Sequence, residues 1–139
     1  MTKAIRVHES GGPEQMHWEA VEVGAPGPGE VRLRQTAVGL NFIDVYHRTG
    51  LYPQPLPFTP GVEGAGVVES IGPGVQGLTV GDRVAYAGPI GGYAEERLIA
   101  ADRLLKLPDD IDDEQAAAMM LQGMTVDLLL NRVRTTQAG

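Results

Sequence analysis

Glycine and proline punctuate the first two thirds of the chain and are nearly absent from the rest. The sequence holds 19 Gly and 10 Pro, most of them in short clusters between stretches with strand character. Because both residues interrupt helices and central strands, this spacing predicts short strands joined by turns. Six or seven such strands indicate a mostly β fold with some α, an antiparallel barrel or sandwich rather than βαβ units.

Residue patterns place the individual strands. Hydrophobic alternation puts Val31, Leu33 and, after Gln35, Ala37 on one face of a strand that is buried on one side. The four prolines of residues 51–61 forbid both a helix interior and a central strand there. The expected strands are 4–9, 16–23, 31–39, 62–72, 83–87 and 93–100.

Two glycines and an acidic residue stand out in the expected strand 62–72. Gly64 and Gly66 suggest a bulge or a close approach of two backbones. Glu63 lies between glycines in a buried-looking strand, and a buried carboxylate needs a partner, for which Arg or backbone N–H groups are the candidates. A structural ion pair and a functional role both remain open for it.

The pattern changes to helix after Pro108. Asp112 can cap a helix with Gln115 as its capping-box partner, and the apolar run 116–121 predicts burial on most sides. Gly123 is expected to break this helix, and 126–133 to form a second one before a polar tail. We therefore divide the chain into a barrel, residues 1–110, and a helical segment, residues 111–139. The apolar helices should pack back on the barrel, dimerise or lead into further chain.

Charge and composition exclude several classes of function. The formal net charge is −7 without any Lys/Arg cluster, which disfavours nucleic acid or an anionic membrane as partner. The chain has no Cys, so disulfides, thiol nucleophiles and Cys-ligated zinc are excluded. His8, His17 and His47 lack metal-ligand spacing and are expected to be exposed. No apolar leader or spanning run is present, so a cytoplasmic protein is expected.

The stretch VGLNFIDVYHRTGLYP, residues 38–53, concentrates polar and aromatic side chains. Asn41 suits a helix N-cap, Gly50 a terminator, and Asp44 with Arg48 an i,i+4 ion pair. A short capped helix explains these residues.

Two tyrosines in and after this stretch are not explained by a capped helix. Tyr46 and Tyr52 are aromatic hydroxyls rather than plain apolar residues, and a phenol packs while offering a polar tip to a ligand. The segment is therefore either a polar helix or one wall of an active site.

Several motifs in one order carry a resemblance to a known family: NFID with Tyr46, GLYP at 50–53, GVEGAGVV at 61–68, VGDRV at 80–84, GGYAEE at 91–96 and EQAAAMMLQGMTV at 114–126. Over essentially its whole length the chain resembles the N-terminal part of the NADPH:quinone oxidoreductases, the zeta-crystallin-like branch of the medium-chain dehydrogenase/reductase superfamily. The resemblance implies a GroES-like β-barrel catalytic domain followed by two C-terminal helices. It also implies that the family's Rossmann domain is absent from this chain.

The same resemblance assigns roles to residues. Asn41, Tyr46 and Tyr52 would line the quinone and nicotinamide pocket, Asn41, Gln122 and Thr125 would contact the cofactor, and Asp44 and Glu63 would support the site. Asn41 and Val62 stand where zinc-dependent relatives carry Cys and His, so no zinc is expected. Leu128 stands where some quinone reductases carry a Tyr, and it offers no polar contact to a cofactor.

The implied function is zinc-independent reduction of a quinone by NADPH, in a full-length homodimer. Hydrogen bonds would then polarise the acceptor oxygen. The chain alone would be inactive. The alternatives are reduction of an enone or alkenal double bond by the same apparatus, and a stand-alone binding or interaction module without activity. NADPH rather than NADH is a family inference.

Overall fold

The computed structural model describes residues 1–133, so the expected tail at 134–139 lies outside the described residues. The elements are β1 Thr2–Arg6, η1 Pro13–Gln15, β2 His17–Val21, β3 Glu30–Val38, α1 Phe42–Thr49, β4 Glu63–Ile71, β5 Arg83–Ala87, β6 Glu96–Ala100, η2 Ala101–Arg103, β7 Leu105–Lys106, α2 Asp113–Asp127 and the π-helix η3 Leu128–Val133. All six expected strands are present; β5 has the predicted ends, and the other five have shifted ends. The two-residue strand β7 was not expected.

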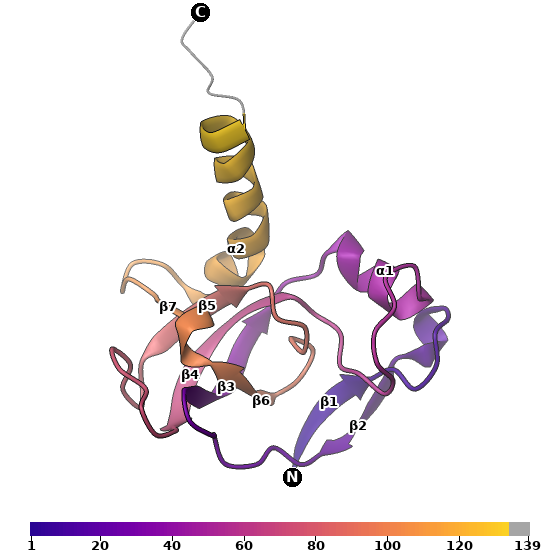
Figure 1. The fold of residues 1–139 in the computed structure, drawn as a ribbon, viewed down its shortest axis with the longest axis horizontal. Coiled ribbons are helices and arrows are strands. Elements are labelled where there is room, and N and C mark those ends of the chain that lie inside the picture. Colours follow the sequence, from indigo (N-terminus) through magenta and orange to yellow (C-terminus); the bar gives the residue numbers. More distant parts are fainter. Residues whose placement is uncertain (134–139) are drawn as a thin grey trace, which may run out of the picture.

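The strands form two antiparallel sheets. Five strands pair in the order β6-β3-β4-β5-β7 and curl around a core, while β1 and β2 form a separate hairpin (Figure 1). The hairpin is tied to the rest by the bond from the Ile5 N–H to the Tyr93 carbonyl, at 2.8 Å, and by a bridge between Val7 and Phe58. All pairings in residues 1–133 are antiparallel, so the prediction of a mostly β, antiparallel fold is confirmed.

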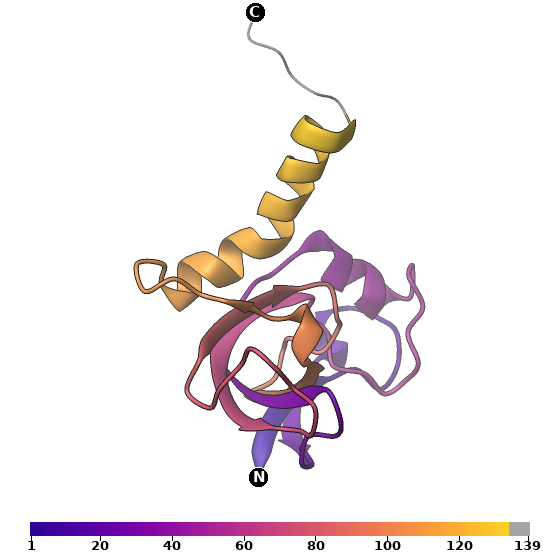
Figure 2. The ribbon, with the colours of Figure 1, turned by 60° about the vertical axis from the view of Figure 1, so that its left-hand side comes forward.

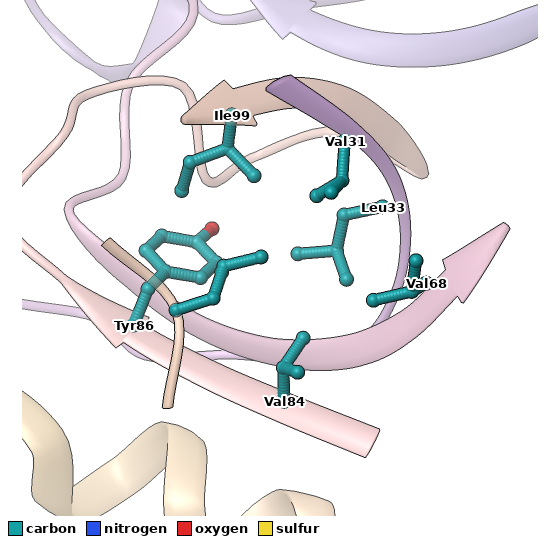
Figure 3. Close-up of a cluster of buried hydrophobic side chains, with 7 residues drawn as sticks. Val31, Leu33, Val68, Val84, Tyr86 and Ile99 are labelled. Carbon is teal, nitrogen blue, oxygen red and sulfur yellow. The ribbon is translucent and has the colours of Figure 1, made fainter. Parts of the chain in front are cut away.

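The core follows the predicted alternation of β3. Val31 and Leu33 are fully buried, whereas Arg32 and Arg34 on the other face pair with Glu96 and Glu69. Ala37 packs against a second, smaller cluster because the register shifts between Gln35 and Ala37. Figure 3 shows the main cluster, which consists of Val31, Leu33, Val68, Val84, Tyr86, Ile99 and Leu104.

Close packing of two backbones explains the glycines of β4. A Cβ on Gly66 would overlap the carbonyl oxygen of Arg34 and lie 3.0 Å from its carbonyl carbon. A Cβ on Gly64 would lie 2.9 Å from the Tyr86 hydroxyl. The β3–β4 ladder also contains register shifts, so both the expected close approach and the expected irregularity are found.

The two expected C-terminal helices are one continuous helix, because α2 runs on directly into η3. Gly123 does not break it, since a single glycine lowers helix stability by only about 1 kcal/mol relative to alanine. The expected burial on most sides is also wrong. Only Ala116 and Ala117 are buried, against Ala65 and Ala85, while Met124 is 56% exposed. Figure 2 shows the helix projecting away from the sheets.

Two aspartates fix the start of α2. Oδ1 of Asp112 accepts the Gln115 N–H at 2.7 Å, which confirms the predicted N-cap. Asp113 joins the helix to the sheet: its carboxylate accepts from the Thr36 hydroxyl at 2.6 Å and from Nε of Arg83 at 2.9 Å. Burial alone would raise the pKa of the Asp113 carboxyl, but the bonds from Thr36 and Arg83 outweigh it and lower that pKa.

We expect Asp113→Asn to lower the free energy of unfolding at pH 7 by about 1–2 kcal/mol. A carboxyl whose pKa is lowered by folding stabilises the protein above its unfolded pKa of about 4 and loses this contribution as the pH falls through the folded value. The difference between wild type and variant should therefore shrink in acid. Urea unfolding at pH 7 and pH 3 measures it, with the exposed Asp102→Asn as control. A difference that is constant with pH would contradict the assignment.

No helix within residues 1–133 is both long enough and apolar enough to cross a membrane.

Candidate active site

The centre of the candidate site is the buried carboxylate of Glu63, at the start of β4, which is 1% exposed. Its Oε1 accepts from Nδ2 of Asn41 at 2.6 Å, and its Oε2 accepts the Leu121 backbone N–H at 2.8 Å. One of the two expected kinds of partner, a backbone N–H, is present, while an amide replaces the arginine. This single carboxylate therefore joins the start of α1 to the middle of α2.

Helix α1 begins as the sequence predicts. Asn41 is the N-cap, Oδ2 of Asp44 accepts the Asn41 backbone N–H at 2.9 Å, and Gly50 ends the helix with a φ of 81°. The expected Asp44–Arg48 ion pair is wrong, because Nη1 of Arg48 donates to the Gly11 carbonyl at 2.6 Å instead. Local spacing permits that ion pair, but the chain around Gly11 offers Arg48 a closer acceptor.

His47 corrects another expectation. Of the three histidines expected to be exposed, His8 and His17 are exposed. His47 is only 7% exposed, and its Nδ1 has no hydrogen-bond partner among the described residues. It lies on the buried face of α1, the face that packs against the rest of the chain.

The two tyrosines form a pair at the end of α1. The rings of Tyr46 and Tyr52 meet edge to face with their centres 5.4 Å apart, and the Tyr52 N–H donates to the Tyr46 carbonyl at 3.0 Å. Tyr52 is 50% exposed and Tyr46 is half-buried. Neither hydroxyl has a hydrogen-bond partner within residues 1–133, so both could donate to a ligand.

A pocket of about 300 Å³ lies where β3, β4 and α2 meet. It is bordered by Ala37, Val38, Gly39, Leu40, Glu63, Glu114, Ala117, Ala118 and Gln122. Gly39 is required there, because a Cβ would lie 2.5 Å from the Ala117 carbonyl oxygen and closer still to the Glu63 carboxylate. Strand and helix can therefore approach closely at this point.

The predicted site residues are thus only partly brought together. Glu63 and Gln122 border one pocket, and Asn41 is bonded to Glu63. Thr125 lies further along α2, exposed, with its hydroxyl bonded to the Leu121 carbonyl at 2.8 Å. The tyrosine pair does not line this pocket. Leu128 is exposed on η3.

Tyr93 is a site residue that no sequence pattern indicates. Its hydroxyl donates to Oδ2 of Asp44 at 2.8 Å, and burial, with the neighbouring Asp44 carboxylate, raises the pKa of the phenol. The pattern of residues 93–100 predicts only a strand, and the motif GGYAEE contributes only to the family resemblance. Nothing local indicates that its tyrosine reaches a helix 49 residues earlier in the chain.

Potential metal ligands do not gather in the part of the chain that the structure describes: no three His, Asp or Glu side chains come together there. Val62, which the resemblance places at a zinc-ligand position, is a buried apolar residue.

Comparison with known proteins identifies the family. The alcohol dehydrogenase GroES-like domain family matches residues 27–109. A quinone oxidoreductase of Pseudomonas aeruginosa is 50% identical over 141 residues, covering 100% of this chain and 43% of that protein. A 2-haloacrylate reductase of a Burkholderia species is 48% identical over 147 residues, covering 100% of this chain and 44% of that protein.

A solved structure supports the same assignment. The structure of the Escherichia coli quinone oxidoreductase complexed with NADPH matches with a TM-score of 0.94 and 41% identity, covering 97% of this chain and 42% of that one. The chain thus spans less than half the length of the relatives it matches. The resemblance carried by the motifs is confirmed: the relatives are quinone oxidoreductases and a related reductase, and the chain belongs to the alcohol dehydrogenase GroES-like domain family.

Proposed function

We propose that this chain forms the substrate side of a zinc-independent, NADPH-dependent quinone oxidoreductase. The observation that carries the proposal is the link between α1 and α2 through Asn41 and Glu63, which lies beside a pocket. It occurs in a chain that is 50% identical to a quinone oxidoreductase. The proposed roles are catalytic for Asn41, Tyr46 and Tyr52, cofactor-binding for Asn41, Gln122 and Thr125, and supporting for Asp44 and Glu63.

Asn41 is suited to polarising a carbonyl oxygen. An amide NH₂ group has two N–H donors, and one of them is engaged by Glu63. The other has no acceptor among the described residues. A buried carboxylate that holds one N–H fixes the orientation of the group, so the second N–H is preorganised as a donor. The unpartnered hydroxyls of Tyr46 and Tyr52 would add further donors.

The described residues fit one end of NADPH. Gln122 borders the pocket with Glu63 and offers an amide to the nicotinamide carboxamide or ribose. Phosphates are usually held by a Gly-rich turn between a parallel strand and a helix, and the strands of residues 1–133 pair only antiparallel. When bound, NADPH would supply the hydride, and this chain would orient the acceptor.

Residue identities support independence from zinc. The sequence contains no Cys to supply a thiolate. Asn41, at the position where zinc-dependent relatives carry Cys, donates a hydrogen bond to Glu63.

NADPH oxidation by the natural protein that contains this chain tests the proposal, with 1,4-benzoquinone as acceptor. We expect quinone-dependent turnover that a zinc chelator leaves unchanged. Turnover abolished by the chelator and restored by zinc, or no quinone-dependent oxidation, would refute it.

Reduction of an activated C=C bond is the second candidate. The 48% identical 2-haloacrylate reductase favours it, because that name describes reduction of a conjugated double bond. Quinones and enones are both conjugated carbonyls, so the same donors would serve either. Parallel assays with an alkenal decide between them by the ratio of the two kcat/KM values.

Tyr52→Phe should lower kcat/KM for the quinone about tenfold, the equivalent of one hydrogen bond, without changing the edge-to-face packing on Tyr46. The stability of the protein should be unaffected, because the hydroxyl has no protein partner in residues 1–133. Trp18→Phe, which alters an equally exposed aromatic on β2, is the control and should leave kcat/KM unchanged. Equal effects of both variants would remove Tyr52 from the site.

We further propose that the 139-residue chain is inactive alone and binds NADPH weakly. Calorimetry that found micromolar or tighter binding would contradict this.

The division at residue 110/111 is also a proposal, supported by the start of α2 at Asp113. A homodimer of the full-length form, a cytoplasmic location and the lack of nucleic-acid or membrane partners remain predictions, the last supported by the net charge of −7.

A further inference from the structure

Tyr93 contacts the first turn of α1 through its hydroxyl. The phenol donates to Oδ2 of Asp44 at 2.8 Å, and the same oxygen accepts the Asn41 N–H at 2.9 Å. Asp44 is 4% exposed, and its Oδ1 has no partner among the described residues. A buried carboxylate is costly unless hydrogen-bonded, so each of these two donors matters.

Two backbone hydrogen bonds hold the main chain of Tyr93, and one close contact holds its ring. The Tyr93 N–H donates to the Pro60 carbonyl at 2.8 Å, and the Tyr93 carbonyl accepts from Ile5 at 2.8 Å. The ring also packs directly on Gly61: a Cβ there would lie 2.5 Å from Cδ1 of Tyr93. Gly61 has a φ of 92°, which other residues rarely adopt. The phenol is therefore presented to Asp44 by a rigid support.

The hydroxyl keeps its proton. Burial, followed by the bond to Asp44, raises the pKa of Tyr93, so the group remains a donor at neutral and alkaline pH. Its proton is thus held against the carboxylate and is poorly suited to transfer to a substrate.

We propose that Tyr93 is a positioning residue: by holding Asp44 it fixes the start of α1, and thereby the orientation of Asn41. The catalytic part of this inference rests on the proposed quinone reductase function. The structural part, a tie from Tyr93 to Asn41 through Asp44, does not.

Amide hydrogen exchange in the 139-residue chain, followed by NMR, tests the structural part. Tyr93→Phe retains the ring and removes only the hydroxyl. We expect exchange at the Asn41 amide to rise about tenfold, as loss of one hydrogen bond to a charged group implies. Tyr86→Phe is the matched control, because it removes another buried hydroxyl, one bonded to Gln35 in the core. Unchanged exchange in Tyr93→Phe, or an equal rise in both variants, would overturn the proposal.

Steady-state kinetics of the natural protein that contains this chain test the catalytic part. Tyr93→Phe should lower kcat for the quinone about tenfold, since small displacements of a positioned group cost rate. On an Asp44→Asn background the same change should have little further effect, because Tyr93 acts through Asp44. Raised exchange with unchanged kcat, or additive losses in the double variant, would overturn the positioning role. A wild-type protein without quinone reduction would instead refute the proposed function and leave the exchange result standing.

Discussion

We expect Glu63→Gln to lower the free energy of unfolding by about 2–3 kcal/mol, as the geometry of the buried carboxylate requires, and to reduce turnover in the proposed quinone reductase. Both carboxylate oxygens accept from N–H groups, one of Asn41 and one of Leu121. Glutamine has one oxygen and one NH₂ group, so one N–H would face another donor without an acceptor. The tie between α1 and α2 would then be broken on one side. Urea unfolding and quinone kinetics measure the two effects.

Glu69→Gln is the matched control for this change. Glu69 lies on the same strand, β4, but its side chain is 34% exposed and pairs with Arg34 at 3.0 Å on the surface. Exposed ion pairs contribute at most about 1 kcal/mol, so this variant should remain close to wild type. Similar losses in both variants would show that Glu63 is an ordinary strand residue.

Gly39→Ala should be at least as damaging, with a loss of about 3 kcal/mol, near the upper end of typical overpacking costs. Its Cβ would meet the Ala117 carbonyl at 2.5 Å and the Glu63 carboxylate at a shorter distance. Backbone on one side and a bonded carboxylate on the other leave no easy relief. We therefore expect α2 to move away from β3 and the bond from Leu121 to Glu63 to lengthen. Thermal or urea unfolding measures the loss, and a crystal structure the displacement.

Gly24→Ala is the control for the glycine change. A Cβ on Gly24 would have no atom within 4 Å, and its backbone is not in the left-handed region. Replacement of such a glycine stabilises proteins by up to about 1 kcal/mol, because it restricts the unfolded chain. If Gly39→Ala were as stable as Gly24→Ala, the close approach of strand and helix would be refuted.

Local patterns predicted much of the fold. Alternation in residues 31–39 predicted the buried face of β3. Gly64 and Gly66 indicated a bulge or a close backbone approach, and only the structure shows that Gly66 approaches Arg34. The caps of both helices were predictable because a cap depends on residues within one turn. Motifs in register, rather than periodicity, indicated the family.

Contacts across the fold were not predictable from spacing. The partner of Glu63 on α2 lies 58 residues away, and it is a backbone N–H within a helix, which no residue type announces. Tyr93 and Asp44 are 49 residues apart, and the Tyr93 ring packs where a side chain on Gly61 would overlap it. The burial of His47 was not predictable, because a helix as short as α1 has too few residues to define its buried face by pattern. The helix break predicted at Gly123 is wrong, because the low helix propensity of one glycine is a weak constraint.

Titration of the 139-residue chain with duroquinone, a quinone without free ring positions, tests the central claim most directly when followed by NMR of the backbone amides. The account predicts weak, saturable shifts that centre on Asn41, Tyr46, Tyr52 and Gln122. A neighbouring apolar pocket of about 330 Å³ shares Val38, Gly39 and Leu40 with the pocket beside Glu63. Ile5 and Trp18 line only this neighbouring pocket, so they provide the internal comparison. Shifts centred on Ile5 and Trp18, or no saturable shifts, would contradict the assignment of α1 and the Glu63 tie as the quinone side of the active site.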